Sequence, residues 1–439
     1  MSKGFIFNHN KCVACAACSA ACVLENGWTS RPRTIFTYNS EVSPYFPLIN
    51  LSLACNHCGT AVCMEGCPAK SYTRDALSGA IIINDKKCIG CKYCQWNCPY
   101  DAPKYDNEAK TIGKCNLCFS GLIEGRLPAC TSACPTGALS FDEIKGQVDE
   151  NTFPWFPDKK LSPKIEFSGK QNYNLLRIIP ERAVEPEIHG EVEREKILSG
   201  DWSLAAFSFI TTISVASIVS SFFKSIFPDK LIFSMMVVLA GTISLFHLGK
   251  KQRAWRAILN IKTSPLSREI ALFILFSIVS LVAVFFQIPG FLIAASITGL
   301  FLLIAIDSVY IYADRRKSVL MHSGQTFLSA LIIISFLSGA ILPFIFIALL
   351  KLASALYLLS INKKTGVNFI IRFFRIAFLF LSGASFLLGT SYSDNVIISL
   401  FLTGEFLDRV IFYIDFEPLR ISSMIKNQFN TSNNEKKRS

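Results

Sequence analysis

Cysteine is the residue type in this sequence whose number and spacing could do chemistry. The 439-residue chain has 16 cysteines, all between Cys12 and Cys134, and they form four groups of four. Thiolates a few residues apart can surround one face of an iron–sulfur cluster, and the repeated C-x2-C-x2-C-x3-C spacing is typical of such sites. The sequence therefore predicts that all of these residues are cluster ligands: Cys12, Cys15, Cys18 and Cys22; Cys55, Cys58, Cys63 and Cys67; Cys88, Cys91, Cys94 and Cys98; Cys115, Cys118, Cys130 and Cys134.

The four groups are expected to work in pairs. In bacterial ferredoxins the fourth cysteine of one group ligates the cluster that the other group holds. A proline follows the last cysteine of the second, third and fourth groups, as Pro68, Pro99 and Pro135. We expect this last cysteine to begin a helix, after which the proline turns the chain away. Residues 79–84 and 135–141 have the composition of short strands. The pattern predicts two ferredoxin-like modules, one around the second and third groups and the other from the first and fourth.

Structural zinc and disulfides are the alternatives for these cysteines. Zinc sites usually separate two cysteine pairs by a finger-length loop, whereas the first and third groups each place four cysteines within 11 residues. Residues 1–7 include no apolar segment of signal-peptide length. Cysteines of a protein that is not exported more often bind metal than form disulfides, so iron–sulfur clusters remain the prediction.

Several clusters in one domain would relay single electrons. Such a relay makes and breaks no substrate bonds itself, so no catalytic residue is predicted in this half of the chain. An electron-transfer role follows, and no nucleic-acid partner is expected.

The remaining sequence has a different composition. The chain is 51% hydrophobic and only 17% charged, with a formal net charge of +12 and a mean hydropathy of +0.39. Soluble domains are usually about 25% charged, so the composition argues against a wholly soluble, a disordered or a small disulfide-bonded protein. Every long apolar segment lies after residue 200. The predicted organisation is a four-cluster domain at 1–145, a linker at 146–201, a membrane anchor at 202–415 and a basic polar tail at 416–439.

The fold class is therefore an α+β double ferredoxin-like domain followed by an all-α polytopic membrane bundle. About 20 mostly apolar residues span a bilayer, and we count eight such segments, with seven to nine compatible with the pattern. A buried soluble bundle is disfavoured because soluble helices keep a polar face. The segments are 203–223, 231–248, 269–286, 289–311, 325–341, 343–361, 368–388 and 394–414.

Charge between the segments indicates both the connector and the orientation. Residues 145–201 contain five prolines and many charges, which is typical of a solvated linker; docking on a partner subunit is the alternative. The basic loops at 249–268, 312–324 and 362–367 and the tail lie on one side of an eight-span bundle. The positive-inside rule then places the cluster domain in the cytoplasm of a prokaryotic cell, unless these loops serve to dock an acidic partner.

A few ionisable residues lie in or beside the apolar segments, where they are costly. Glu405 and Arg409 are four residues apart on a helix and can pair, either as a structural ion pair or as the lining of a quinone pocket or proton path. His247 ends the second segment and, with Arg256 nearby, could hydrogen-bond a quinone carbonyl and pass a proton; the alternative is an interfacial histidine. Weaker candidates are Asp307, Tyr310 and Lys351. Haem is not expected, because His247 alone of the five histidines lies near a segment.

These motifs carry a family resemblance. Residues 1 to about 145 resemble the four-cluster electron-transfer subunit of the dimethyl sulfoxide reductase family of molybdoenzymes, including the spacing of the second and fourth cysteine groups. Residues 200 to about 420 resemble that family's eight-span anchor in three short stretches, at 247–249, 264–269 and 404–405. The departure is that one chain unites two subunits that the family usually encodes separately.

The resemblance implies four [4Fe–4S] clusters, because Cys94 stands where some relatives have tryptophan. It also implies menaquinol oxidation at the anchor and a separate molybdopterin catalytic subunit. The same series of clusters could carry electrons in the opposite direction, from a formate dehydrogenase-type or hydrogenase-type donor to quinone. A membrane redox sensor is a further alternative. The implied ligand sets are set 1, Cys12, Cys15, Cys18 and Cys134; set 2, Cys115, Cys118, Cys130 and Cys22; set 3, Cys55, Cys58, Cys63 and Cys98; and set 4, Cys88, Cys91, Cys94 and Cys67.

Overall fold

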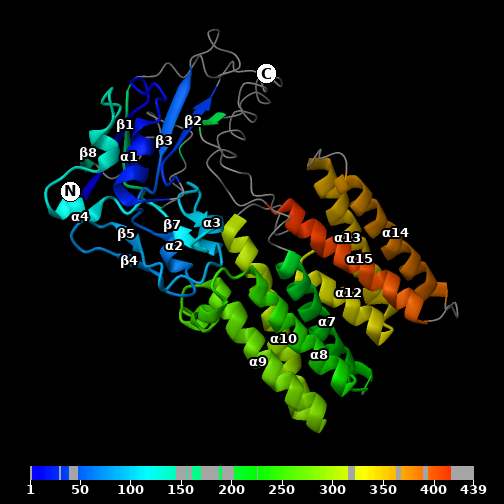
Figure 1. The fold of residues 1–439 in the computed structure, drawn as a ribbon. Helices are drawn as coiled ribbons and strands as arrows, with labels where there is room; N and C mark the ends of the chain where they lie inside the picture. The colour runs from blue at the N-terminus through cyan, green and yellow to red at the C-terminus, as the bar shows by residue number, and fades with distance from the viewer. Residues whose placement is uncertain are drawn as a thin grey trace. The chain divides into compact units, whose positions relative to one another are not determined.

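The computed structural model divides the chain into two compact units (Figure 1). The N-terminal unit contains all the cysteines, and the C-terminal unit is helical. The structure describes residues 2–28, 31–38, 48–144, 156, 161–169, 187–189, 202–224, 226–314, 322–361, 367–388 and 394–416.

A three-stranded sheet joins the two ends of the cysteine-rich sequence. Its central strand β1 (Ser2–Asn8) pairs antiparallel with β8 (Leu139–Ile144) and parallel with β9 (Ile165–Ser168). Cys12 follows β1 closely and Cys134 shortly precedes β8, so the sheet brings the first and fourth cysteine groups together. The strand predicted to leave the fourth group is confirmed by β8.

The other strands form a second small sheet and two hairpins. In the second sheet, the central strand β2 (Thr34–Tyr38) pairs antiparallel with β3 (Ile49–Leu53) and with β10 (Glu187–His189). The hairpins are β4 (Tyr72–Arg74) with β5 (Ile81–Ile83), and β6 (Lys104–Asp106) with β7 (Thr111–Gly113). The strand predicted before the third cysteine group is β5.

Short helices carry the third cysteine of each group, which corrects the sequence prediction. The fourth cysteine does not begin a helix: α3 (Tyr93–Asn97) contains Cys94 and ends at Cys98, just before Pro99. Proline disfavours helical backbone in the residue before it, so the helix must stop there. The first group lacks this proline, and its helix α1 (Ala17–Asn26) continues past Cys22. The other short helices of this unit are α2 (Val62–Glu65), α4 (Phe119–Ile123) and α5 (Ala129–Ser132).

Part of the predicted linker belongs to the N-terminal core. Phe156, Leu161, Ile165 and Phe167 are all buried among the apolar residues that surround the cysteines. β9 also adds a strand to the first sheet. The described parts of this segment are therefore structural rather than only connecting.

The described residues of the C-terminal unit form eight α-helices, close to the predicted segments. They are α7 (Trp202–Lys224), α8 (Lys230–Ser244), α9 (Pro265–Phe286), α10 (Pro289–Asp314), α12 (Thr326–Ser338), α13 (Ile341–Ile361), α14 (Val367–Leu388) and α15 (Asp394–Asp415). Two 3-10 helices, η4 (Leu245–His247) and η5 (Lys251–Ile258), lie between α8 and α9.

Five of these helices are long and apolar enough to cross a bilayer in the described part of the chain. They cover 202–224, 230–247, 265–286, 289–313 and 341–358. The predicted count of eight spans is thus not reached by this criterion: α12 has only 13 residues, and α15 contains Glu405, Asp408 and Arg409. Large apolar side chains of α8 and α9, including Leu231, Met235, Ile278 and Phe286, are exposed, as lipid-facing residues would be.

Small residues let the long helices approach closely. A Cβ atom at Gly299 of α10 would lie 2.9 Å from a methyl group of Val215 on α7 and 3.1 Å from the Phe276 ring on α9. Serine and threonine hydroxyls along α7 donate back to the helix's own carbonyls, as Thr212 Oγ1 does to Ser208 O at 2.7 Å. Both features are typical of packed membrane helices.

Candidate cluster sites and a buried polar network

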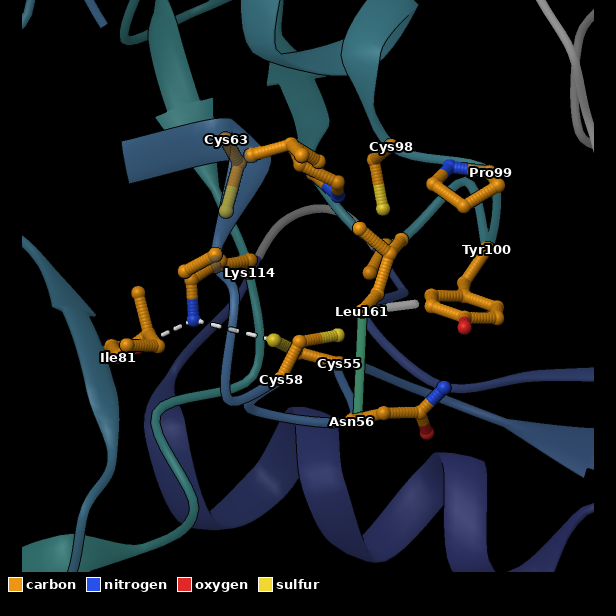
Figure 2. Close-up of a pocket in the computed structure, with 14 residues that line it drawn as sticks. Cys55, Asn56, Cys58, Cys63, Ile81, Cys98, Pro99, Tyr100, Lys114 and Leu161 are labelled. Atoms are coloured by element: carbon orange, nitrogen blue, oxygen red, sulfur yellow. Dashed lines mark hydrogen bonds between the residues drawn. The ribbon is translucent and has the colours of Figure 1, made fainter. Parts of the chain in front are cut away.

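One pocket of the N-terminal unit is lined by Cys55, Cys58, Cys63 and Cys98 (Figure 2). The first two cysteines come from the loop after β3, Cys63 lies in α2 and Cys98 caps α3. The pocket holds about 380 Å³ of space, including the part open to solvent. Its cysteines are the four members of set 3, although they come from two different sequence groups.

A second pocket gathers the cysteines of set 1. It is lined by Cys12, Cys15, Cys18 and Cys134, so the first group is completed by the last cysteine of the fourth. The β1–β8 pairing described above produces this convergence of residues that are more than 100 positions apart in the sequence.

The remaining cysteines also gather in two sets of neighbours. The pKa of Cys22 is raised to about 12, chiefly by burial; Arg33 opposes the shift, and the nearby Cys130 and Cys118 thiols add to it. The Cys115 thiol also lies near Cys22 and Cys130. Set 2 is therefore assembled from the first and fourth groups.

Set 4 shows the same arrangement. Burial raises the pKa of Cys94, and so do the neighbouring thiols of Cys91, Cys88 and Cys67. Cys67 comes from the second group and the other three from the third. Each ligand set implied by the family resemblance thus corresponds to cysteines that lie near one another in this structure.

The loops that hold the cysteines repeat one backbone feature. The second residue after the first cysteine of each group has a positive φ: Ala14 (55°), His57 (43°), Gly90 (70°) and Leu117 (65°). This turn lets the backbone N–H of Gly90 donate to Cys88 Sγ, and that of Leu117 to Cys115 Sγ, each at 3.4 Å. Hydrogen bonds to a cysteine sulfur stabilise its thiolate form, which is the form that ligates metal.

The electrostatics of the sites fit an anionic group. Burial raises the pKa of Cys98 to about 12, so this thiol would not ionise at neutral pH without a compensating cation or metal. Two basic side chains are also buried among them, Arg33 at 2% exposure and Lys114 at 1%. The Nε and Nη2 atoms of Arg33 have no hydrogen-bond acceptor of ordinary geometry in the described part of the chain. Buried charges of this kind require a counter-charge, and clusters held by thiolates would supply it.

These two basic residues are not apparent from the sequence pattern. Lys114 directly precedes Cys115, which is the only signal in the sequence, and Arg33 lies 11 residues beyond Cys22.

The sulfurs do not converge on sites for a single metal ion. Among the described residues, no three His, Cys, Asp or Glu side chains are placed to hold one metal ion.

In the C-terminal unit, His247 and Arg256 lie on the two successive 3-10 helices. His247 ends η4, its Nδ1 atom is buried, and its imidazole donates a hydrogen bond to the backbone carbonyl of Ser244. Arg256 lies in η5 with its guanidinium carbon 5.1 Å from the centre of the Trp255 ring. The two predicted residues therefore belong to one connecting segment between α8 and α9.

The predicted ion pair between Glu405 and Arg409 is wrong, because each has a nearer partner on another helix. Lys351 of α13, fully buried, places its Nζ atom 2.5 Å from Glu405 Oε2. It also lies 3.0 Å from Asp408 Oδ2. Arg375 of α14 is 3.0 Å from the other oxygen of Asp408. Two cations and two carboxylates thus join α13, α14 and α15 in one buried cluster.

Arg409 points to a different group of helices. Its Nε atom donates to Ser208 Oγ of α7 at 2.8 Å, and its Nη1 atom donates to Gly324 O at 2.9 Å. Asp307 of α10 lies 3.7 Å away and accepts hydrogen bonds from the backbone N–H groups of Thr326 and Phe327. Asp307 therefore caps the N-terminus of α12 and also compensates the positive charge of Arg409.

Another ion pair completes the polar network. Arg372 of α14 donates to both oxygens of Asp415 at 2.6 and 2.5 Å, and His322 lies 3.3 Å from the same carboxylate. Four of the residues singled out from the sequence thus hold helices together: Glu405, Arg409, Lys351 and Asp307.

Two geometries now define the class of protein: cysteine sets around pockets in one unit, and long apolar helices in the other. The chain is an iron–sulfur protein with a multi-pass membrane anchor. Residues 47–144 match the 4Fe-4S dicluster domain, and residues 200–363 match the dimethyl sulfoxide reductase anchor subunit (DmsC).

Known relatives identify the family. The B subunit of the anaerobic dimethyl sulfoxide reductase of Haemophilus influenzae is 34% identical over 156 residues, covering 32% of this chain and 74% of that protein. Protein NrfC of Escherichia coli is 32% identical over 196 residues, covering 44% and 83%. The B subunit of the E. coli reductase is 31% identical over 161 residues, covering 34% and 74%. The chain belongs to this family of iron–sulfur electron-transfer subunits, and it carries the anchor domain in the same polypeptide.

Proposed function

We propose that this protein oxidises a quinol, such as menaquinol, at its helical unit and delivers the electrons to a separate molybdopterin catalytic subunit. The observation that carries this proposal is the union of four converging cysteine sets and an anchor in one chain. The names of the relatives favour a terminal reductase of the dimethyl sulfoxide reductase type, working in anaerobic respiration.

Four [4Fe–4S] clusters would be held by sets 1 to 4 as defined above. When bound, the clusters supply one-electron transfer from one site to the next. The protein's own residues bury nine of the 16 cysteines and donate backbone N–H groups to some of the sulfurs. The buried thiols and the buried Arg33 guanidinium, which forms no ion pair with a described carboxylate, support this assignment.

His247 is the side chain proposed to bind quinol. One of its ring nitrogens donates to the backbone carbonyl of Ser244, which leaves the other nitrogen of a neutral imidazole to accept a hydroxyl proton from a bound quinol. Arg256, on the same connecting segment, would help to orient the head group. Glu405 and Arg409, proposed from the sequence as further quinone residues, would act indirectly by holding the helices around the site.

The proposed topology completes the five apolar spans with α12, α14 and α15, to give eight. The excess of basic residues in the loops on one side supports a cluster unit in the cytoplasm and an anchor in the cytoplasmic membrane. The flow of electrons could also be reversed, from a formate dehydrogenase-type or hydrogenase-type partner to quinone, since cluster potentials depend on their surroundings.

The test of the function is quinol-dependent reduction of the clusters in the purified full-length protein. Replacing His247 by alanine should abolish rapid reduction by a menaquinol analogue while dithionite still reduces the clusters fully. The exposed Lys251→Ala variant, four residues further along the chain, is the control and should behave as the wild type. Normal quinol reduction in the His247→Ala variant would remove His247 from the site, and an iron-free wild-type protein would remove the function.

A further inference from the structure

Two buried cations lie between successive cysteine sets. We propose that Arg33 and Lys114 each raise the reduction potentials of the two clusters beside them. This inference rests on the proposed function, because it concerns the clusters that the function requires.

Lys114 lies between set 3 and set 2. Its Nζ atom donates to Cys55 Sγ at 3.4 Å and to the backbone carbonyl of Ile81 (Figure 2). It donates also to Cys115 O at 2.8 Å, and Cys115 is the next residue in the chain. The ammonium group therefore touches one ligand of set 3 and the backbone of one ligand of set 2.

Arg33 has the equivalent place between set 2 and set 1. Its Nη1 atom donates to Ser52 Oγ at 3.1 Å, and this hydroxyl lies 3.4 Å from Cys18 Sγ of set 1. The guanidinium also lies near Cys130 of set 2. Its guanidinium carbon lies over the Phe5 ring, 4.7 Å from the ring centre, a contact that helps to hold it in place.

The counter-charges of both cations point to the clusters. Lysine and arginine are almost never fully buried unless they are paired, and neither residue forms an ion pair with a carboxylate in the described part of the chain. Their described polar contacts are carbonyl oxygens, a hydroxyl and cysteine sulfurs. A nearby positive charge favours the reduced, more negative state of a cluster and so raises its potential.

The positions of the two cations predict a distinctive pattern. Lys114 acts on the clusters of sets 3 and 2, whereas Arg33 acts on those of sets 2 and 1. Set 2 is therefore shared, and set 4, where the Tyr72 side chain lies near Cys94, is affected least. Residues that only supported the local packing would not produce this overlap.

The experiment is an EPR-monitored redox titration of the full-length protein in mild detergent, for Arg33→Gln and Lys114→Gln. Glutamine keeps a hydrogen-bond donor but removes the charge. We expect two of the four midpoint potentials to fall in each variant, with one cluster common to both and one unmoved in both. Lys110→Gln is the control, because Lys110 is exposed only four residues from Lys114 and should leave all the potentials in place.

The second comparison uses a variant that keeps the positive charge at position 33. Arg33→Lys should keep the potentials near those of the wild type, because the positive charge stays beside sets 1 and 2. Assembled clusters with unshifted potentials in both glutamine variants would overturn the inference while leaving the proposed function intact. If the glutamine variants assemble no clusters, Arg33→Met and Lys114→Met are titrated instead. Unshifted cluster potentials in these methionine variants count against a tuning role. So does a failure of the methionine variants to assemble clusters. A wild-type protein without clusters would refute the proposed function itself.

Discussion

Replacing Asp408 by asparagine should strongly destabilise the helical unit. The Asp408 side chain is fully buried and forms ion pairs with Lys351 and Arg375, each at 3.0 Å. Ser323 Oγ also donates to it at 2.9 Å. Asparagine has nearly the same shape but replaces one carboxylate oxygen with an NH2 group, so the substitution removes the charge and the acceptor for one of the two cations.

The size of the effect follows from the balance of charge. At an effective dielectric constant of about 20, opposite charges about 3 Å apart attract by about 5–6 kcal/mol, and Asp408 has two such partners. Relief of the carboxylate's desolvation cost offsets several kcal/mol of this attraction. Removing one member of a buried ionic group costs about 3–5 kcal/mol. An ordinary hydrogen bond between membrane helices contributes on average only about 0.6 kcal/mol.

The assay is reversible unfolding of the full-length protein in mixed micelles, followed by the far-UV circular dichroism of the helices. Asp229→Asn is the matched control, because Asp229 is an exposed N-cap of α8 and asparagine caps a helix equally well. A loss below about 1 kcal/mol for Asp408→Asn would show that the cluster contributes only hydrogen bonds. The Lys351→Met variant should be destabilised as well, because it leaves Glu405 and Asp408 with less compensation.

Four further substitutions test the packing and the cysteine sets. Cys63→Ser and Cys98→Ser should each remove the same cluster, although they lie in different sequence groups, and loss of two different EPR signals would refute set 3. Gly66→Ala should reduce the iron content per chain, because its new Cβ atom would clash with Asn97 Nδ2 and lie 3.0 Å from Val62 O; Gly121→Ala, with only ordinary contacts, is the control. Gly299→Ala should destabilise the bundle by about 1–3 kcal/mol through overpacking. Gly290→Ala on the same helix is the control, because a Cβ atom there meets open space. Equal thermal unfolding midpoints of the two variants would contradict this packing.

The sequence was most informative where chemistry imposes spacing. A cluster needs several thiolates within reach, so the cysteine groups, the strands β5 and β8 and the exchange of cysteines between groups were all open to prediction. Hydropathy likewise located the long helices. The start of the short helices was mispredicted, because the proline after the fourth cysteine marks where a helix ends and not where it begins.

Long-range partners of single charged residues could not be predicted in the same way. Glu405 and Arg409 have ideal spacing for an ion pair along one helix, yet Lys351 lies 54 positions from Glu405 and becomes its partner only after α13 packs against α15. Arg33 and Lys114 belong to no periodic pattern. Their importance comes from burial beside cysteines, which depends on the tertiary fold.

The buried cations of the two units have different kinds of counter-charge. In the helical unit, Lys351 and Arg375 face Glu405 and Asp408, so their charges balance within the polypeptide. A closed network of this kind has no need of a ligand and is best suited to fixing the helices in place. In the N-terminal unit, Arg33 and Lys114 face only neutral groups and cysteine sulfurs among the described residues. Their charge is balanced only when the thiols ionise and hold clusters, so cluster insertion should also stabilise the fold around these two residues.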